Sequence, residues 1–197
     1  MNQLESICVF CGSSAGAQPI FQEQAQQLGA ALVARGIHLV YGGGSIGLMG
    51  AVARTVATGG GKVTGVIPRS LKTKEVVGEV YGELVVVKSM HERKATMARL
   101  AQAFIAMPGG FGTLDELFEV ITWGQLGIHA KPIGLLNVAG FFDFIESWVE
   151  HALSQGFIRP QHRHLLVIER EPAALIERLL HHTPPAGLVQ WLDLDET

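Results

Sequence analysis

Short apolar runs alternate along the chain with longer segments in which apolar residues recur at helical spacing. The apolar runs predict strands at residues 6–10, 37–41, 63–67, 84–87, 103–107, 133–136 and 165–168. The longer segments predict helices at residues 19–35, 47–58, 90–101, from 113 onward, 142–155 and 172–182. Strand and helix therefore alternate along nearly the whole chain, with one polar loop at 68–78 in place of a helix.

This alternation predicts an α/β fold built on a parallel sheet. The strands are apolar along their length, which is typical of strands covered on both faces. We therefore expect a single-domain, Rossmann-like doubly wound sheet with helices on both faces over residues 1–182, and a C-terminal tail at 183–197. Ligands bind such sheets beyond the carboxyl ends of the strands. Four loops with unusual residues leave strands at that edge and should converge on one pocket: 11–14, 42–46, 88–94 and 108–113.

A proline and three glycines separate the strand at 103–107 from the following helix. Glycines let backbone N–H groups approach a ligand closely, and the helix start adds partial positive charge, so this junction predicts a phosphate site with Glu116 beside it. Thr113 and Glu116 also have the form of a capping box, in which Glu116 only bonds back to the Thr113 amide. We favour a functional role, because Glu119 and Trp123 share the face of Glu116 and a tryptophan between two glutamates indicates a pocket or a subunit contact.

The segment 89–94 supplies charge of the opposite sign. Ser89 and Glu92 predict a capping box that opens the helix at 90–101. Arg93 and Lys94 lie in its first turn, where the helix dipole disfavours cations, so they are either solvated surface residues or face a compensating anion. The planar guanidinium of Arg93 suits a phosphate or a carboxylate. We expect Arg93 at the same sheet edge as Glu116.

The glycine-rich segment 42–47 fits the pattern G-x-G-x-x-G, which raises an NAD(P)-dependent oxidoreductase as an alternative. That fingerprint normally follows the first strand of its unit, whereas this one follows the second. The next strand ends without an acid to hold a ribose hydroxyl, although Arg69 could meet a 2′-phosphate. Glycines that only let a helix and a strand pack closely are an equal interpretation of the segment.

Composition and charge narrow the function classes. Hydrophobic residues make up 48% of the 197 residues and the formal net charge is −3, so we expect a folded protein with no basic surface for nucleic acid or an anionic membrane. No apolar run reaches the roughly 20 residues of a membrane span, and the N-terminus lacks a signal-peptide pattern, so we expect a cytoplasmic protein. Cys8 and Cys11 form a C-x-x-C, but residues three apart on a strand point to opposite faces, so we interpret them as structural rather than as a redox or metal pair.

Two motifs together resemble the LOG ("Lonely Guy") family of cytokinin riboside 5′-monophosphate phosphoribohydrolases. The stretch 108–116 reads P-G-G-F-G-T-L-D-E, which is similar to the family signature PGGxGTxxE, and residues 93–94 match the R-K pair that precedes it. The resemblance runs from about residue 7 to 180 and includes C-G-S-S at 11–14, G-G-G-x-x-G-L-M-G at 42–50 and E-V-I-T-W at 119–123. Family members have often been labelled lysine decarboxylase, but no lysine here lies in a recognisable pyridoxal-phosphate context.

The resemblance implies hydrolysis of the N-glycosidic bond of an adenine-type nucleoside 5′-monophosphate, either AMP or an N6-substituted cytokinin ribotide, to free base and ribose 5-phosphate. It implies that Arg93 and Glu116 are catalytic, and it assigns substrate contacts to Glu75, Arg93, Lys94, Gly110, Phe111, Gly112, Thr113, Leu114, Asp115, Glu116 and Thr122. Phe111 stands where the family often has tyrosine, so a hydroxyl contact is lost. The reaction that the resemblance implies requires no metal and no organic cofactor. LOG-like chains of this length are commonly homodimers.

The expected chemistry agrees with the residues. Breaking a ribosyl–nitrogen bond builds positive charge on the sugar, which a carboxylate can stabilise, so we expect Glu116 to do this and to hold the attacking water. The backbone at 110–113 would hold the 5′-phosphate, Arg93 would orient Glu116, and Ser13, Gly43 and Met90 would complete the pocket. The alternative is a non-catalytic nucleotide-binding protein similar to the molybdenum-cofactor carrier proteins, although such a binder has no need of a carboxylate beside the anion.

Overall fold

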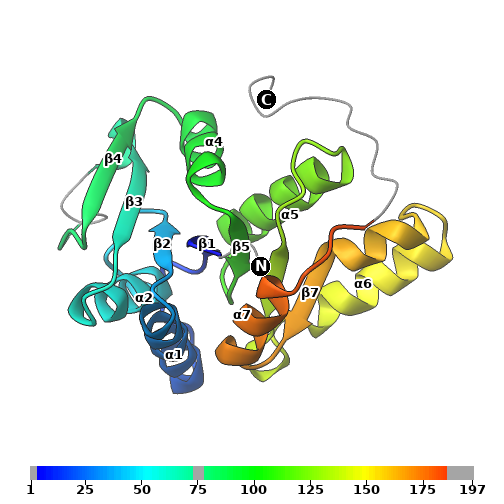
Figure 1. The fold of residues 1–197 in the computed structure, drawn as a ribbon, viewed down its shortest axis with the longest axis horizontal. Coiled ribbons are helices and arrows are strands. Elements are labelled where there is room, and N and C mark those ends of the chain that lie inside the picture. Colours follow the sequence, from blue (N-terminus) through cyan, green and yellow to red (C-terminus); the bar gives the residue numbers. More distant parts are fainter. Residues whose placement is uncertain (1–3, 73–77, 186–197) are drawn as a thin grey trace.

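The computed structural model describes residues 4–72 and 78–185 and contains one parallel sheet (Figure 1). Its order is β4-β3-β2-β1-β5-β6-β7, and every pairing between neighbours is parallel. The Rossmann-like doubly wound fold predicted from the sequence is confirmed. The strands are β1 (Ser6–Phe10), β2 (His38–Tyr41), β3 (Val63–Pro68), β4 (Glu83–Val87), β5 (Ala103–Ala106), β6 (Ile133–Leu136) and β7 (Leu166–Glu169).

Helices cover both faces of the sheet, and each face has its own core cluster. Apolar residues of α1, α2 and α7 pack on one face, and those of α4, α5 and α6 pack on the other (Figure 1). The helices are α1 (Pro19–Ala34), α2 (Gly47–Thr58), α4 (Met90–Leu100), α5 (Phe111–Gln125), α6 (Asp143–Ser154) and α7 (Pro172–Leu180). Short 3-10 segments lie at η1 (Arg69–Leu71), η2 (Val138–Gly140) and η3 (Pro160–Leu165).

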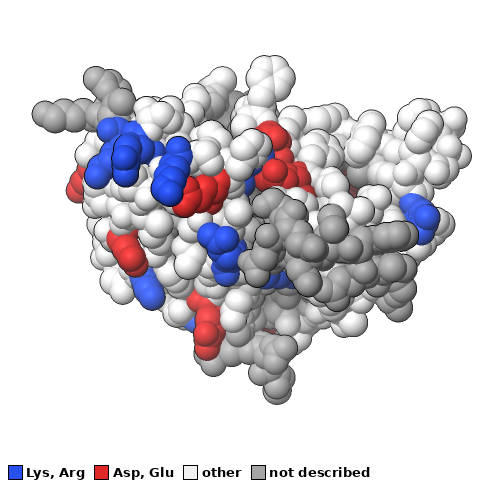
Figure 2. All heavy atoms as spheres, turned by 90° about the horizontal axis from the view of Figure 1, so that it is seen from above, with Lys and Arg blue, Asp and Glu red and all other residues white. Residues whose placement is uncertain are grey.

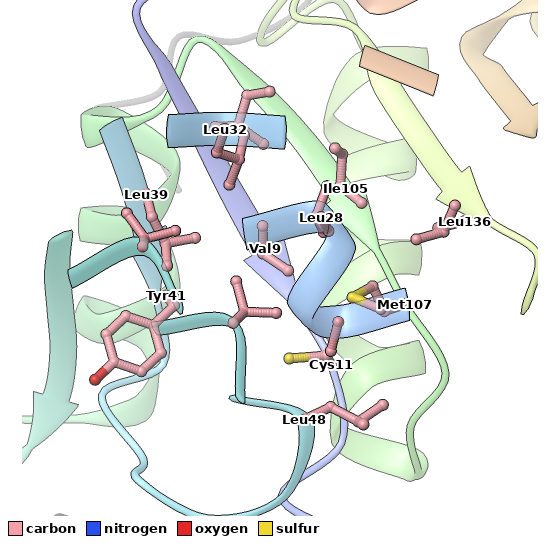
Figure 3. Close-up of a cluster of buried hydrophobic side chains, with 14 of the residues drawn as sticks. Val9, Cys11, Leu28, Leu32, Leu39, Tyr41, Leu48, Ile105, Met107 and Leu136 are labelled. Atoms are coloured by element: carbon pink, nitrogen blue, oxygen red, sulfur yellow. The ribbon is translucent and has the colours of Figure 1, made fainter. Parts of the chain in front are cut away.

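The alternation of side chains along β1 shows how the two clusters form. Ile7 and Val9 point into the α1/α2/α7 cluster, part of which is drawn in Figure 3, whereas Cys8 and Phe10 point into the α4/α5/α6 cluster. Cys11 belongs to the first cluster, so the two sulfurs of the C-x-x-C lie on opposite faces of the sheet. Both thiols are free and buried, as the structural interpretation of the pair predicted.

The centre of the sheet is a topological switch point. The chain builds outward from β1 to β4, and the crossover through α4 then returns it to β5 beside β1, from which it builds outward in the other direction. The N–H of Gly12 donates to the carbonyl oxygen of Pro108 over 3.0 Å, so the loops that follow β1 and β5 meet directly. This crevice beyond the carboxyl ends of adjacent strands is where doubly wound sheets bind ligands.

Most predicted elements agree with the structure to within about a residue, but the start of α5 does not. The helix begins at Phe111, two residues before the predicted Thr113, and Gly110 in an extended conformation is its N-cap. Thr113 is therefore inside the helix and cannot cap it. The capping-box interpretation of Thr113 and Glu116 is wrong, because the Glu116 side chain instead reaches a residue of α4.

The outer surface carries charge and exposed aromatic side chains. Acidic and basic residues are interspersed with large uncharged areas on the face shown in Figure 2. Phe144, Trp148 and Phe157, on and just after α6, are 53%, 50% and 86% exposed.

None of the helices in the described ranges has both the length and the apolar character needed to cross a bilayer.

Candidate active site between α4 and α5

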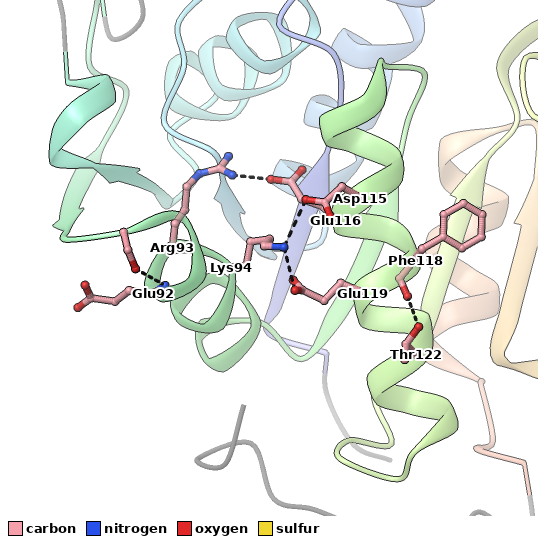
Figure 4. Close-up of polar contacts among 9 residues, drawn as sticks. Glu92, Arg93, Lys94, Asp115, Glu116, Phe118, Glu119 and Thr122 are labelled. Carbon is pink, nitrogen blue, oxygen red and sulfur yellow. Dashed lines mark hydrogen bonds and ion pairs between the residues drawn. The ribbon is translucent and has the colours of Figure 1, made fainter.

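The first turn of α4 is fixed by side-chain bonds to its own backbone. Ser89 Oγ accepts a hydrogen bond from the Glu92 N–H over 3.1 Å, as the predicted capping box requires. The Glu92 carboxylate accepts from the N–H of Lys88 over 2.6 Å, one residue before the N-cap. With its start held in this way, α4 projects Arg93 and Lys94 toward α5 (Figure 4).

Arg93 and Glu116 form a buried ion pair between the two helices. Arg93 Nη1 donates to Glu116 Oε1 over 2.6 Å, and the two side chains are only 9% and 10% exposed. Arg93 Nε donates to the carbonyl oxygen of Val66 on β3 over 3.1 Å, so the guanidinium is held from two directions. Figure 4 shows the two side chains pointing toward one another. The expected meeting of these residues at one sheet edge is confirmed as geometry.

Burial determines how Glu116 ionises. Removal from water raises the pKa of the Glu116 carboxyl above its usual value of 4.5, and the charge and hydrogen bond of Arg93 oppose this rise. A buried charge without a partner is costly, so each member of the pair depends on the other. The site therefore holds a carboxylate whose proton affinity is raised and whose orientation is fixed by one guanidinium.

A second cation bridges the same two helices nearer to solvent. Lys94 Nζ lies 2.8 Å from Glu119 Oε1 and 3.3 Å from Asp115 Oδ2 (Figure 4). Burial alone would lower the pKa of Lys94, but the hydrogen bonds and charges of these two carboxylates outweigh it and raise the pKa. The α5 face that carries Glu116 and Glu119 therefore lies opposite the cations of α4, which accounts for its two glutamates.

Within residues 4–72 and 78–185, the first N–H groups of α5 have no hydrogen-bond acceptor and lie beside open space. The first N–H groups of a helix have no intrahelical acceptor, and the N-cap residue Gly110 supplies no side-chain bond to them. A Cβ atom added at Gly110 or Gly112 would meet no described atom within 4 Å, so there is room beside this backbone. Phe111 is 94% exposed, whereas Thr113 is buried with its hydroxyl against Gly109.

The glycine-rich loop before α2 is arranged differently. The N–H groups of Leu48 and Met49 both donate to the carbonyl oxygen of Gly12, over 3.1 and 3.2 Å. A dinucleotide-binding loop needs such groups for the pyrophosphate. In this protein they hold the loop after β1, so the packing interpretation of the glycine pattern is favoured over the NAD(P) interpretation.

The remaining predicted site residues lie at varied distances from the ion pair. Met90, at the start of α4, is 43% exposed, and Ser13 is exposed on the loop after β1. Gly43 packs near Ile67 with a φ of 76°, and Leu114 is partly buried against the α4/α5/α6 cluster. Thr122 donates to the Phe118 carbonyl on a side of α5 that faces away from Arg93 (Figure 4), and Glu75 lies outside the described residues.

The structure adds two contacts that sequence reasoning missed. The Val66 carbonyl oxygen accepts from Arg93, and Gly42 lies directly against the same guanidinium. The Val66 contact uses a main-chain carbonyl, which any residue type has, so the sequence could not indicate it. Gly42 lies in the glycine-rich segment 42–47, but that segment was interpreted through the dinucleotide pattern.

Metal-ligating side chains do not gather at the site. Over residues 4–72 and 78–185, no group of three or more histidine, cysteine, aspartate or glutamate residues has metal-binding geometry. The candidate chemistry consists of one buried carboxylate, Glu116, two cations that pair with it and with Asp115 and Glu119, and a helix N-terminus.

Comparison with known proteins extends the resemblance across the chain. Residues 49–179 match a family model described as "Possible lysine decarboxylase". The Oryza sativa subsp. japonica protein named probable cytokinin riboside 5′-monophosphate phosphoribohydrolase LOGL9 is 55% identical over 183 residues, covering 93% of this chain and 81% of that protein. Cytokinin riboside 5′-monophosphate phosphoribohydrolase LOG5 of Arabidopsis thaliana is 50% identical over 93% of this chain and 80% of that protein.

Solved structures of the same fold are more distant in sequence. The molybdenum cofactor binding protein of Rippkaea orientalis has a TM-score of 0.68 and 22% identity, covering 90% of this chain and 96% of that one. The molybdenum cofactor carrier protein of Chlamydomonas reinhardtii has a TM-score of 0.67 and 20% identity, covering 91% and 99%. These structural similarities show a shared fold alone, whereas the sequence identity of 50–55% to the curated relatives shows membership of their family. The chain belongs to the LOG family, whose curated members are named cytokinin riboside 5′-monophosphate phosphoribohydrolases.

Proposed function

We propose that the protein hydrolyses the N-glycosidic bond of adenine-type nucleoside 5′-monophosphates. The bond between C1′ of the ribose and the purine nitrogen breaks, water adds its oxygen to C1′, and the purine leaves with a proton. The products are a free base and ribose 5-phosphate. The observation that carries the proposal is the buried Arg93–Glu116 pair, 2.6 Å apart and one turn from the start of α5.

The substrate's phosphate would lie at the N-terminus of α5. Free N–H groups and the helix dipole favour an anion there, and the space beside Gly110 and Gly112 admits one. Because Glu116 follows Gly112 by about one turn, a phosphate at the helix start would bring the attached ribose near the carboxylate. Lys94 is paired with Asp115 and Glu119 on the same helix and offsets their negative charge near this position.

Glu116 would act on the sugar, and Arg93 would act on Glu116 and the purine. As the glycosidic bond lengthens, positive charge develops on the ribose ring, and a carboxylate held beside it stabilises that charge. The same carboxylate can accept a proton from the attacking water. Arg93 holds the carboxylate in one orientation and can donate to the departing base.

A panel of nucleotides tests the reaction class. Purified protein incubated with AMP, N6-isopentenyl-AMP and other nucleoside 5′-monophosphates should release free base, detected by chromatography, while adenosine without the phosphate should react far more slowly. The ratio of the AMP and N6-isopentenyl-AMP rates identifies the preferred base. Binding of these nucleotides without any base release would contradict the proposal and favour a nucleotide carrier.

The oligomeric state is part of the proposal. We propose a homodimer formed through the aromatic face of α6, where Phe144 and Trp148 are about half exposed. Trp148 stacks edge-on against Phe118 of α5, and both line an apolar groove of about 240 Å³. The sequence pointed instead to Trp123, but that side chain packs partly buried in the core cluster under α5. A second copy of the chain is the occupant whose own matching face would bury these side chains.

A further inference from the structure

The guanidinium of Arg93 lies against a glycine of the loop that follows β2. A Cβ atom at Gly42 would fall 2.1 Å from Arg93 Nη2 and 3.3 Å from Cζ, far inside van der Waals contact. The same atom would meet Met49 Sδ at 3.2 Å, so the space is closed on that side as well. The Arg93 guanidinium therefore packs directly against the backbone of Gly42, in the space that a side chain there would fill.

The guanidinium cannot yield to a side chain at Gly42 without losing a partner. Its Nε is bonded to the Val66 carbonyl and its Nη1 to Glu116, so two of its edges are already held. Arg93 is only 8% exposed, which leaves no solvated position close by. A displacement must stretch one of these two hydrogen bonds, and the bond to Glu116 is the one that orients the carboxylate.

We propose that Gly42 is a positioning residue for the proposed reaction, required because only glycine lets the Arg93 guanidinium lie where it can orient Glu116. This role rests on the proposed function of the ion pair, but the contact that carries it is independent of any substrate. It also gives the first glycine of the G-x-G-x-x-G pattern a purpose unrelated to dinucleotides. The φ of Gly42 lies outside the left-handed range, so its lack of a side chain, rather than its backbone conformation, is what the site uses.

The substitution Gly42→Ala tests the positioning role through kinetics. The protein should fold, because the clash is with the end of a long side chain rather than with backbone, and kcat should fall roughly tenfold to 100-fold because the reacting groups are misplaced. KM should change much less, since the phosphate site at α5 is untouched. Gly124→Ala is the matched control, because a Cβ there meets His129 only at an ordinary 3.4 Å. An unchanged kcat in Gly42→Ala would overturn the proposal.

A double-mutant cycle tests the contact without any assay of activity. In the natural sequence Gly42→Ala should lower Tm by roughly 2–4 °C, whereas in an Arg93→Ala background it should lower Tm much less, because only the milder 3.2 Å contact with Met49 Sδ remains. Equal losses in the two backgrounds would mean that Gly42 serves the fold alone and would refute the positioning role. Because this readout needs no substrate, it separates failure of this inference from failure of the proposed reaction.

Discussion

Arg93 and Glu116 show how a pair of residues can be both costly and useful. Each charge is removed from water, and each is retained only because the other is 2.6 Å away. Groups with shifted pKa values in such pairs are often those that do chemistry. The raised pKa of Glu116 indicates that burial outweighs the nearby positive charge in setting its proton affinity.

The pH dependence of kcat should report this shift. The proposed reaction needs Glu116 as a carboxylate, so activity is lost as pH falls through the pKa of that group. Because burial raises this pKa, the acidic limb of kcat should have its midpoint above 4.5. Arg93, Lys94 and Asp115 are the nearby charges that modulate it. The measurement is kcat at saturating nucleotide across the acidic range, and a midpoint at or below 4.5 would show that Arg93 dominates.

At the scale of elements, α5 combines two functions in one helix. Its N-terminus offers uncapped N–H groups, and its second turn carries Glu116 toward α4. A helix that lacks an N-cap side chain gives up stability. In the proposed reaction, that loss leaves the donors free for the phosphate of the substrate.

Gly110→Asp should stabilise the protein and weaken its function. The extended backbone of Gly110 suits an N-cap aspartate, and its Cβ would meet open space, so unfolding should cost about 0.5 kcal/mol more. The new carboxylate would occupy the phosphate position, so KM for AMP should rise. Gly110→Asn is the matched control, since it caps without charge and should raise KM less. Thermal unfolding measures the change in stability, and steady-state kinetics measure the change in KM. An unchanged KM in Gly110→Asp would contradict a phosphate site at the N-terminus of α5.

The sequence could predict much of the element order but not the start of α5. Alternating apolar runs indicated the parallel sheet, and the helix predicted separately at 47–58 coincides with α2. Phe111 and Gly112 look like loop residues because glycine is a poor helix former. They are helical here because Gly110 takes the extended N-cap conformation and the helix packs on the sheet behind it.

The site was predictable only where residue types carry the signal. The charges of Arg93 and Glu116, and their places after strands, were sufficient to bring them to one edge of the sheet. The contacts that hold Arg93 were not predictable, because the Val66 carbonyl and the bare backbone of Gly42 become neighbours only once β2 and β3 pair. Thr122, assigned by resemblance, points away from the pair, so no contact with it follows from this chain's geometry.

At the scale of the whole molecule, the site and the proposed dimer face lie on the same face of the sheet, with α5 between them. The ion pair lies between α4 and α5 (Figure 4), whereas the aromatic face of α6 packs against Phe118 on the other side of α5. Both use the same helix, on different sides. A partner bound to α6 would therefore lie close to one side of α5, while the other side of α5 faces the site.

Trp148→Glu should convert the proposed dimer to a monomer. A charge in the centre of an apolar contact is left without a partner, which opposes association. Light scattering coupled to size-exclusion chromatography measures the mass. Leu71→Glu is the control, because Leu71 is an exposed apolar residue on η1, outside the aromatic face, and its replacement should leave the mass unchanged. An unaltered dimer in Trp148→Glu would place the interface elsewhere, and a monomeric natural protein would refute the dimer itself.

The central claim is that the Glu116 carboxylate performs the hydrolysis, and the most direct test is Glu116→Gln. This variant keeps the shape and a hydrogen-bond acceptor for Arg93 but removes the negative charge. We expect kcat for base release to fall about 100-fold or more, with AMP binding by calorimetry still measurable. Glu177→Gln, which changes an exposed glutamate of α7, should behave as the natural protein. Near-normal release of free base by Glu116→Gln would contradict the account.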